Sequence, residues 1–220
     1  FGYTRQTLGY HKPQFDNLEV DTTHWEAPID EKPGDVHISG GQYLLGSLPD
    51  RPFVFDNELD AHQVRVETFT ISRTAVANWE FAAFVDDGGY EREEFWTDDG
   101  WLWRNSVRAT HPVYWQREGN QWLCREFDRL VSLDPFLPVL HVNWFEATAF
   151  CRWAKRRLPT EAEWEMAASF EPNTNQKRRF PWGNESATAS TANLDWRTGG
   201  CVDVRGLPQS DSAFGCRQMI

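Results

Sequence analysis

The pattern of apolar and polar residues between positions 138 and 169 predicts a short strand followed by two amphipathic helices. The β-prone run ends at Asn143, whose side chain can cap a helix that begins at Trp144, and Glu146 completes a capping box three residues later. Apolar residues then recur every three or four positions, as one buried helix face requires: Trp144, Ala147, Cys151 and Ala154. Pro159 stops this helix.

A second helix follows directly. Thr160 and Glu163 form a second capping box, and an inward stripe is expected at Trp164, Ala167 and Ala168. From composition alone, residues 138–169 are interpreted as a packed helix pair whose tryptophans belong to the hydrophobic core.

The first half of the chain predicts strands around one further helix. Residues 35–47 suggest a hairpin that turns at Gly40 and Gly41, and residues 62–71 alternate well enough to form a strand. Residues 114–122 predict another hairpin, with a turn made by Glu118, Gly119 and Asn120.

The helix between these strands is expected to be capped by Asn78 and ended by Gly88 and Gly89. It carries the apolar side chains of Phe81, Phe84 and Val85. Residues 1–10 are typical of the tail of a helix closed by Gly9, whereas residues 11–34 are typical of an extended linker. Residues 171–212 show little periodicity and predict a long irregular segment.

Composition indicates a globular protein and excludes two classes of partner. The chain has 220 residues, 40% hydrophobic content and 12 tryptophans, which is enough for one large core. Its apolar runs are short and no signal-peptide pattern opens it, so we expect no membrane partner. The formal charge of -11 argues against nucleic-acid binding.

The cysteines predict free thiols rather than disulfides or a zinc site. They lie at positions 124, 151, 201 and 216, with no CxxC pair among them. Cys151 falls on the apolar face of a predicted helix, where a buried thiol is expected. We therefore expect the protein to function in a reducing cytoplasm.

Four motifs, in order, give the chain a family resemblance. They are HVNWFEATAFCRWA, RLPTEAEWEMAA, FPWGN at residues 180–184 and ANLD at residues 192–195. Together they closely resemble the formylglycine-generating-enzyme-like domain, also called the sulfatase-modifying-factor fold. The resemblance covers residues 35–220 and implies an α+β, C-type-lectin-like fold with much irregular loop.

Two further segments resemble one branch of that family, the ergothioneine-type sulfoxide synthases. The first is AAFVDDGGYEREEFWTDDGWLWR at residues 82–104, and the second is TRQTLGY at residues 4–10. The second segment is similar to the last helix of the DinB-like four-helix domain that precedes the fold in that branch. The resemblance thus implies a helical-domain remnant at 1–10, a linker at 11–34 and a C-terminally truncated domain at 35–220.

In that branch an iron(II) ion is held by histidines of the helical domain, two of them in an HxxxH arrangement. Spacing of four places both imidazoles on one helix face. The six histidines of this chain never lie within four residues of each other: His11, His24, His37, His62, His111 and His141. The iron ligands are therefore expected upstream of Phe1, and the isolated chain is expected to bind no iron and to be inactive.

The resemblance leaves the catalytic residues outside the chain and suggests one weak metal site within it. The family's catalytic tyrosine and polar residues are expected past Ile220. Structural calcium in formylglycine enzymes suggests Asn193 and Leu194 as ligands, with Asp203 or Asp211 as possible substitutes for an absent DGF turn. The alternative is that Asn193 bonds within its own loop.

Two classes of function stay open. The first is part of an iron- and O2-dependent enzyme that joins hercynine to cysteine or γ-glutamylcysteine, with ovothiol and selenoneine synthases and formylglycine-generating enzymes as relatives. Its partners would be these small molecules and its own N-terminal helical domain, and the aromatic residues would allow a cage for the trimethylammonium group. The second is a non-catalytic, lectin-like binding module.

Overall fold

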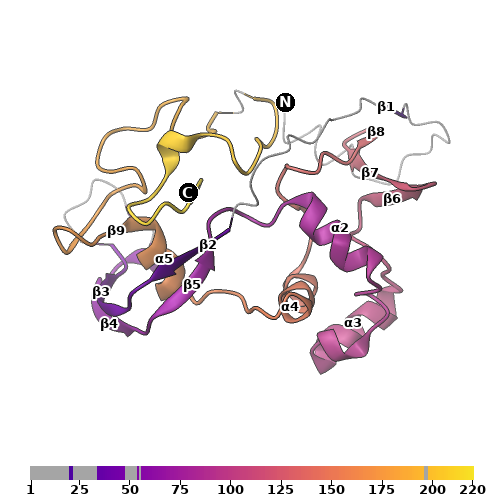
Figure 1. Ribbon diagram of the computed structural model, residues 1–220, viewed down its shortest axis with the longest axis horizontal. Helices are drawn as coiled ribbons and strands as arrows, with labels where there is room; N and C mark the ends of the chain where they lie inside the picture. Colours follow the sequence, from indigo (N-terminus) through magenta and orange to yellow (C-terminus); the bar gives the residue numbers. More distant parts are fainter. Residues whose placement is uncertain (1–19, 22–33, 48–53, 55, 196–197) are drawn as a thin grey trace. The chain divides into compact units, whose positions relative to one another are not determined.

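The computed structural model describes residues 20–21, 34–47, 54, 56–195 and 198–220, which form two compact units (Figure 1). Unit 1 comprises Phe1–Ile29 and Ala77–Leu158, and unit 2 comprises Asp30–Val76 and Pro159–Ile220. The predicted helical remnant at 1–10 and nearly all of the predicted linker lie outside the described residues.

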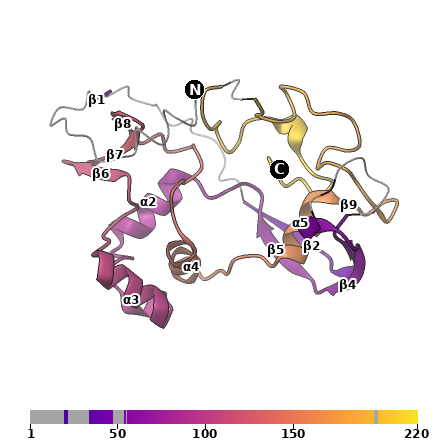
Figure 2. The same cartoon turned by 180° about the vertical axis from the view of Figure 1, so that it is seen from behind.

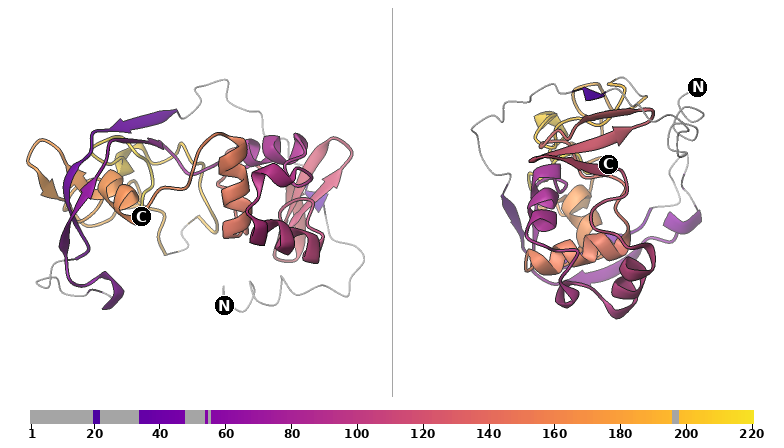
Figure 3. Two further views of the ribbon diagram at one scale, coloured as in Figure 1. Left: turned by 90° about the horizontal axis from the view of Figure 1, so that it is seen from below. Right: turned by 90° about the vertical axis from the view of Figure 1, so that its right-hand side faces the viewer.

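Unit 2 is built on a long two-stranded antiparallel ribbon. Strand β2 (Asp35–Ile38) pairs with β5 (Phe69–Ser72), and β3 (Gly41–Leu45) pairs with β4 (His62–Val66). One register runs through both pairs, because Ile38 faces Phe69 and Gly41 faces Val66. The left-hand view of Figure 3 shows this ribbon in indigo and purple.

The predicted hairpin turn at Gly40 and Gly41 is therefore wrong. These glycines mark a bend in one strand of the ribbon, and the true hairpin connection is the segment between β3 and β4. A Cβ atom on Gly40 would lie 2.2 Å from the carbonyl oxygen of Val66, so glycine allows the two backbones to approach closely at the bend. The predicted strand at 62–71 is likewise divided between β4 and β5.

Helix α5 (Glu161–Ser169) packs on β3 and β4 and is followed by a small hairpin of β9 (Phe170–Glu171) and β10 (Gln176–Lys177). The core between them contains Val36, Ile38, Tyr43, Val66, Phe69, Met166, Ala167, Ala168, Cys216 and Met219. In the predicted irregular segment at 171–212, the described residues after β10 are irregular apart from the short 3-10 helix η3 (Pro208–Ser210). A further 3-10 helix, η1 (Asp56–Glu58), lies between β3 and β4.

The described residues of unit 1 form three helices and a small sheet (Figure 2). The helices are α2 (Asn78–Asp86), α3 (Asp98–Val107) and α4 (Trp144–Trp153), with η2 (Glu93–Phe95) between the first two. The sheet has the order β1 (Val20–Asp21), β8 (Arg129–Ser132), β7 (Gln121–Glu126) and β6 (Trp115–Glu118). The predicted hairpin is confirmed as β6 and β7, whereas β8 and α3 were not predicted.

The two capping boxes predicted in the helix pair are confirmed. Asn143 Oδ1 accepts from the Glu146 backbone N–H at 3.0 Å, and Thr160 Oγ1 accepts from that of Glu163 at 3.3 Å. Helix α4 ends at Trp153, before the predicted proline, because Lys155 adopts a left-handed conformation with φ of 57°.

Three details of the predicted helices are wrong. Trp144 and Trp164 are 60% and 42% exposed, because the buried faces centre instead on Phe150 and Met166. Asn78 is the first helical residue rather than the cap, and its side-chain amide donates to the Asp134 carbonyl at 2.8 Å. The cap position is taken by Ala77, whose N–H is bonded by the Glu80 carboxylate at 2.9 Å.

Candidate functional site

The GGY turn predicted to mark the family branch is joined to α4 by a buried phenol–carboxylate bond. Tyr90 donates its hydroxyl proton to Glu146 Oε1 at 2.5 Å, and both residues are buried. The other carboxylate oxygen of Glu146 accepts from the backbone N–H of Asn143 at 2.8 Å. Glu146 therefore serves both as a helix cap and as the acceptor for the turn.

Aromatic packing explains why this turn contains glycine and tyrosine. A Cβ atom on Gly89 would lie 2.0 Å from the Phe84 ring, so a side chain would collide with the core. The Gly89 carbonyl accepts from Trp96 Nε1 at 2.9 Å, and the Trp96 ring contacts that of Tyr90 at 5.3 Å between centroids. Further ring contacts involve Phe81, Phe95, Trp103, Trp115, Phe145, Phe150 and Trp153. These rings form a packed core.

Burial controls the protonation of this pair. Burial raises the pKa of Glu146, although hydrogen bonds from Tyr90 and Asn143 and the nearby His111 oppose the shift. Burial and the charge of Glu146 raise the pKa of Tyr90, so its hydroxyl remains a donor. The arrangement can hold the turn against the helix, but neither group has the exposure that substrate contact requires.

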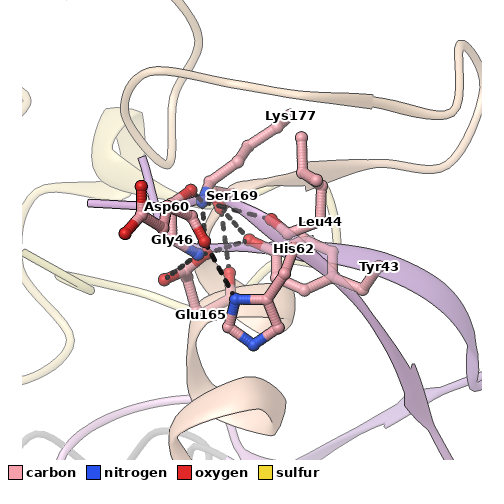
Figure 4. Close-up of polar contacts among 8 residues, drawn as sticks. All are labelled: Tyr43, Leu44, Gly46, Asp60, His62, Glu165, Ser169 and Lys177. Carbon is pink, nitrogen blue, oxygen red and sulfur yellow. Dashed lines mark hydrogen bonds and ion pairs between the residues drawn. The ribbon is translucent and has the colours of Figure 1, made fainter. Parts of the chain in front are cut away.

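A second polar network lies in unit 2 (Figure 4). The Tyr43 hydroxyl donates to Glu165 Oε1 at 2.8 Å and lies 2.7 Å from Ser169 Oγ. The same carboxylate accepts from the Gly46 N–H at 3.1 Å. Burial, together with the charge of Glu165, raises the pKa of Tyr43, so the phenol is a permanent donor here as well.

Lys177 completes this network from the β9–β10 hairpin. Its ammonium pairs with Glu165 and donates to the carbonyl oxygens of Gly46 and Leu44 at 2.6 and 3.3 Å. Nearby, His62 Nδ1 lies 3.0 Å from the Asp60 carbonyl. Neither Tyr43 nor Lys177 was singled out from the sequence, because only the fold brings the hairpin over α5.

The described histidines do not gather into a metal site. No group of three His, Cys, Asp or Glu side chains suited to a metal occurs within the residues that the structure describes. His37 contacts Thr70, His111 contacts the Pro112 carbonyl and His141 packs on the Tyr114 ring, whereas the two N-terminal histidines, His11 and His24, lie outside the described residues.

The weak calcium candidates lie in the irregular part of unit 2. Asn193 donates to the Gly200 carbonyl at 2.9 Å and accepts from the Thr198 hydroxyl at 2.9 Å, which is the loop-bonding arrangement. Leu194 has an exposed side chain. The two substitute acids each pair with an arginine: Asp203 with Arg205 and Asp211 with Arg217. A calcium role for Asn193 and Leu194 stays a prediction.

Burial makes the thiols of the buried cysteines unreactive. Cys151 and Cys216 are buried, and burial raises the pKa of each thiol. Burial also raises the pKa of the half-buried Cys124 to about 12. Cys201 is exposed, contrary to the general expectation of buried thiols. In the part of the chain that the structure describes, no helix has both the length and the apolar character needed to cross a membrane.

Comparisons with known proteins agree with the resemblance found in the sequence. The chain is 41% identical over 179 residues to hercynine oxygenase of Mycolicibacterium thermoresistibile, covering 81% of this chain and 40% of the relative. It is also 41% identical over 179 residues to hercynine oxygenase of Mycobacterium tuberculosis, covering 81% of this chain and 42% of the relative. The chain thus spans about two fifths of the length of these relatives.

Two further similarities concern the wider family and the fold. Formylglycine-generating enzyme of Thermomonospora curvata is 37% identical over 174 residues, covering 72% of this chain and 55% of the relative. The structure of PvdO from Pseudomonas aeruginosa shares the fold, with a TM-score of 0.55 at 18% identity over 86% of this chain and 72% of that one. The family model of the sulfatase-modifying factor enzyme 1-like domain matches residues 22–217, and the chain belongs to this family.

Proposed function

We propose that the chain is the formylglycine-generating-enzyme-like part of an iron(II)- and O2-dependent hercynine oxygenase of ergothioneine biosynthesis. The observation that carries this proposal is the 41% identity to hercynine oxygenases over 179 residues. The branch-marking GGY turn supports it, because Tyr90, Gly89 and Trp96 each have a defined packing role in unit 1.

The reaction would join the sulfur of cysteine or γ-glutamylcysteine to C2 of the hercynine imidazole, giving a sulfoxide and water at the expense of O2. Iron would supply the oxygen chemistry when bound. The described residues do not fit iron, since they bring no three suitable ligands together. The six histidines of the chain also include no HxxxH pair, and we propose that the iron ligands belong to a helical domain of the DinB-like kind outside residues 1–220.

The role of this chain would be to form a rigid scaffold for that site. Two phenol–carboxylate bonds hold other segments against helices within the two units: the buried bond from Tyr90 to Glu146 holds the GGY turn against α4, and the part-buried bond from Tyr43 to Glu165 holds β3 against α5. The buried rings of unit 1, such as Phe81, Tyr90 and Phe150, are committed to the core rather than to a substrate cage. We propose that the contacts to the thiol donor come from the helical domain and from the C-terminal part of the C-type-lectin-like domain, both outside residues 1–220.

The alternative activity is formylglycine generation, which the 37% identity to a formylglycine-generating enzyme favours. That chemistry needs a reactive cysteine pair. Cys151 and Cys216 do not supply it, because burial raises the pKa of both thiols and holds them as the less nucleophilic neutral form. The four cysteines are free thiols, which fits a reducing compartment, and we propose the cytoplasm as the location.

The test is to incubate the protein encoded by the complete gene with hercynine, Fe(II), O2 and, in parallel, cysteine, γ-glutamylcysteine or a selenium donor. Mass spectrometry is expected to find a sulfoxide conjugate of hercynine with one sulfur donor and none after chelation of iron. The proposal is contradicted if hercynine is unchanged with every donor while the protein is folded and iron-loaded. Metal analysis of the 220-residue chain is expected to find no bound iron.

A further inference from the structure

The Lys177 ammonium lies in a cage of oxygen atoms contributed by two separate segments of unit 2, the end of β3 with Gly46 and helix α5. The carbonyl oxygens of Gly46 and Leu44 lie 2.6 and 3.3 Å from Nζ, and the Glu165 carboxylate is its ion-pair partner. The face of the Tyr43 ring closes a fourth side, with its centroid 5.5 Å from Nζ. Figure 4 shows these groups converging on the end of the lysine side chain.

The chemistry of the cage matches a small monovalent cation. An ammonium group has three N–H donors, and three oxygen atoms are available to accept them. Backbone carbonyl oxygens are also the ligands that replace the hydration shell of K⁺. One carboxylate balances one positive charge, and its oxygens are held in place by the Tyr43 hydroxyl and the Gly46 N–H.

The cage also lies at the base of the connection between β3 and β4. Gly46 begins this connection, and the neighbouring Ser47 N–H donates to the Glu58 carbonyl at 2.7 Å, which ties its two ends together. A cation at the cage therefore links α5, the end of β3 and the start of the connection. Without the Lys177 ammonium, the part-buried Glu165 carboxylate would have no counter-ion and would destabilise the same region.

We infer that this cage is a monovalent-cation site which the protein fills with its own lysine ammonium. Removal of the ammonium leaves the two carbonyls, the carboxylate and the ring face, so K⁺ or NH₄⁺ can take its place. The site concerns the folding of unit 2 and does not depend on the proposed oxygenase function.

The test is cation rescue of the Lys177→Ala variant of the full 220-residue chain. Alanine removes the charge and the stem, so the space of the ammonium is left open, and the melting temperature is expected to fall by about 6 °C or more in tetramethylammonium chloride, whose cation is too large to enter. Potassium, ammonium or methylammonium chloride at equal concentration is expected to restore at least half of the loss. Lys155→Ala, which alters an exposed lysine, is expected to show no such difference between salts.

Two additional measurements make the result decisive. Adding Glu165→Gln to Lys177→Ala is expected to abolish the rescue, because the neutral amide no longer balances a cation. In the unaltered chain, Lys177 is expected to react with an acylating reagent at least tenfold more slowly than Lys155, and this comparison holds even if the variant does not fold. Equal loss of stability in all salts, or equal acylation of the two lysines, would overturn the inference.

Discussion

The buried Glu146 and the part-buried Glu165 each accept a hydrogen bond from a tyrosine, but only Glu165 has a charged partner. Glu165 pairs with the Lys177 ammonium, whereas hydrogen bonds from Tyr90 and the Asn143 backbone serve Glu146. A buried carboxylate with weaker compensation favours its neutral form. The pKa of Glu146 is accordingly raised, mainly by burial.

This difference predicts how stability depends on pH in Glu146→Gln. Because the pKa of Glu146 is higher in the folded state, its contribution to stability is fully present below the unfolded pKa and is lost as pH rises through the folded pKa. The glutamine variant lacks this loss. Its free energy of unfolding relative to the unaltered chain is therefore expected to increase from pH 4 toward pH 8, measured by urea denaturation.

Glu165→Gln is the matched control. It removes the counter-ion of Lys177, so it is expected to lower the free energy of unfolding at neutral pH. Unlike Glu146→Gln, it does not remove a carboxylate that lacks a charged partner. A Glu146→Gln difference that stays constant or decreases with rising pH would show that Glu146 is not held at a raised pKa.

At the scale of elements, the sequence predicts those features that depend on residues close together in the chain. The capping boxes of Asn143 and Thr160 depend on residues three positions apart, and both are present. Helix α3 was missed although Thr97 caps it through Gly100 N–H at 3.0 Å, ahead of two acids that suit a first turn. A threonine followed by two acids is the local signal of a helix start, and it is present at residues 97–99.

Features set by long-range packing could not be predicted in this way. The bend at Gly40 has the same local composition as a hairpin turn, and only the pairing of β2 with β5 distinguishes the two. Trp164 was placed in the core because it fits a helical stripe, yet the facing strands pack on Met166 and Ala167 instead.

The two adjacent glycines give a direct test of the bent ribbon. Gly40→Ala is expected to destabilise the chain by about 1–3 kcal/mol, because its Cβ would collide with the backbone of Val66 and Glu67. Gly41→Ala is expected to change stability by no more than about 0.5 kcal/mol, since no atom lies within 4 Å of its added Cβ. Urea denaturation would measure both; equal costs would rule out the close approach at Gly40.

At the scale of the whole molecule, the family could be predicted from the sequence and the active site could not. The motifs around residues 138–195 identify a family that the comparisons confirm over residues 22–217. The chain spans about two fifths of the hercynine oxygenases, and its described residues hold no group of side chains suited to a metal. The proposed chemistry is therefore tested on a protein that spans the full length of these relatives.

The most direct test of the central claim is a competition assay with the iron-loaded protein from the complete gene. Hercynine with γ-glutamylcysteine and cysteine, and a cysteine-containing sulfatase peptide, would be supplied together under O2, and all products identified by mass. The proposed function predicts a hercynine sulfoxide conjugate and an unmodified peptide. Conversion of the peptide cysteine to formylglycine, with hercynine left intact, would contradict it.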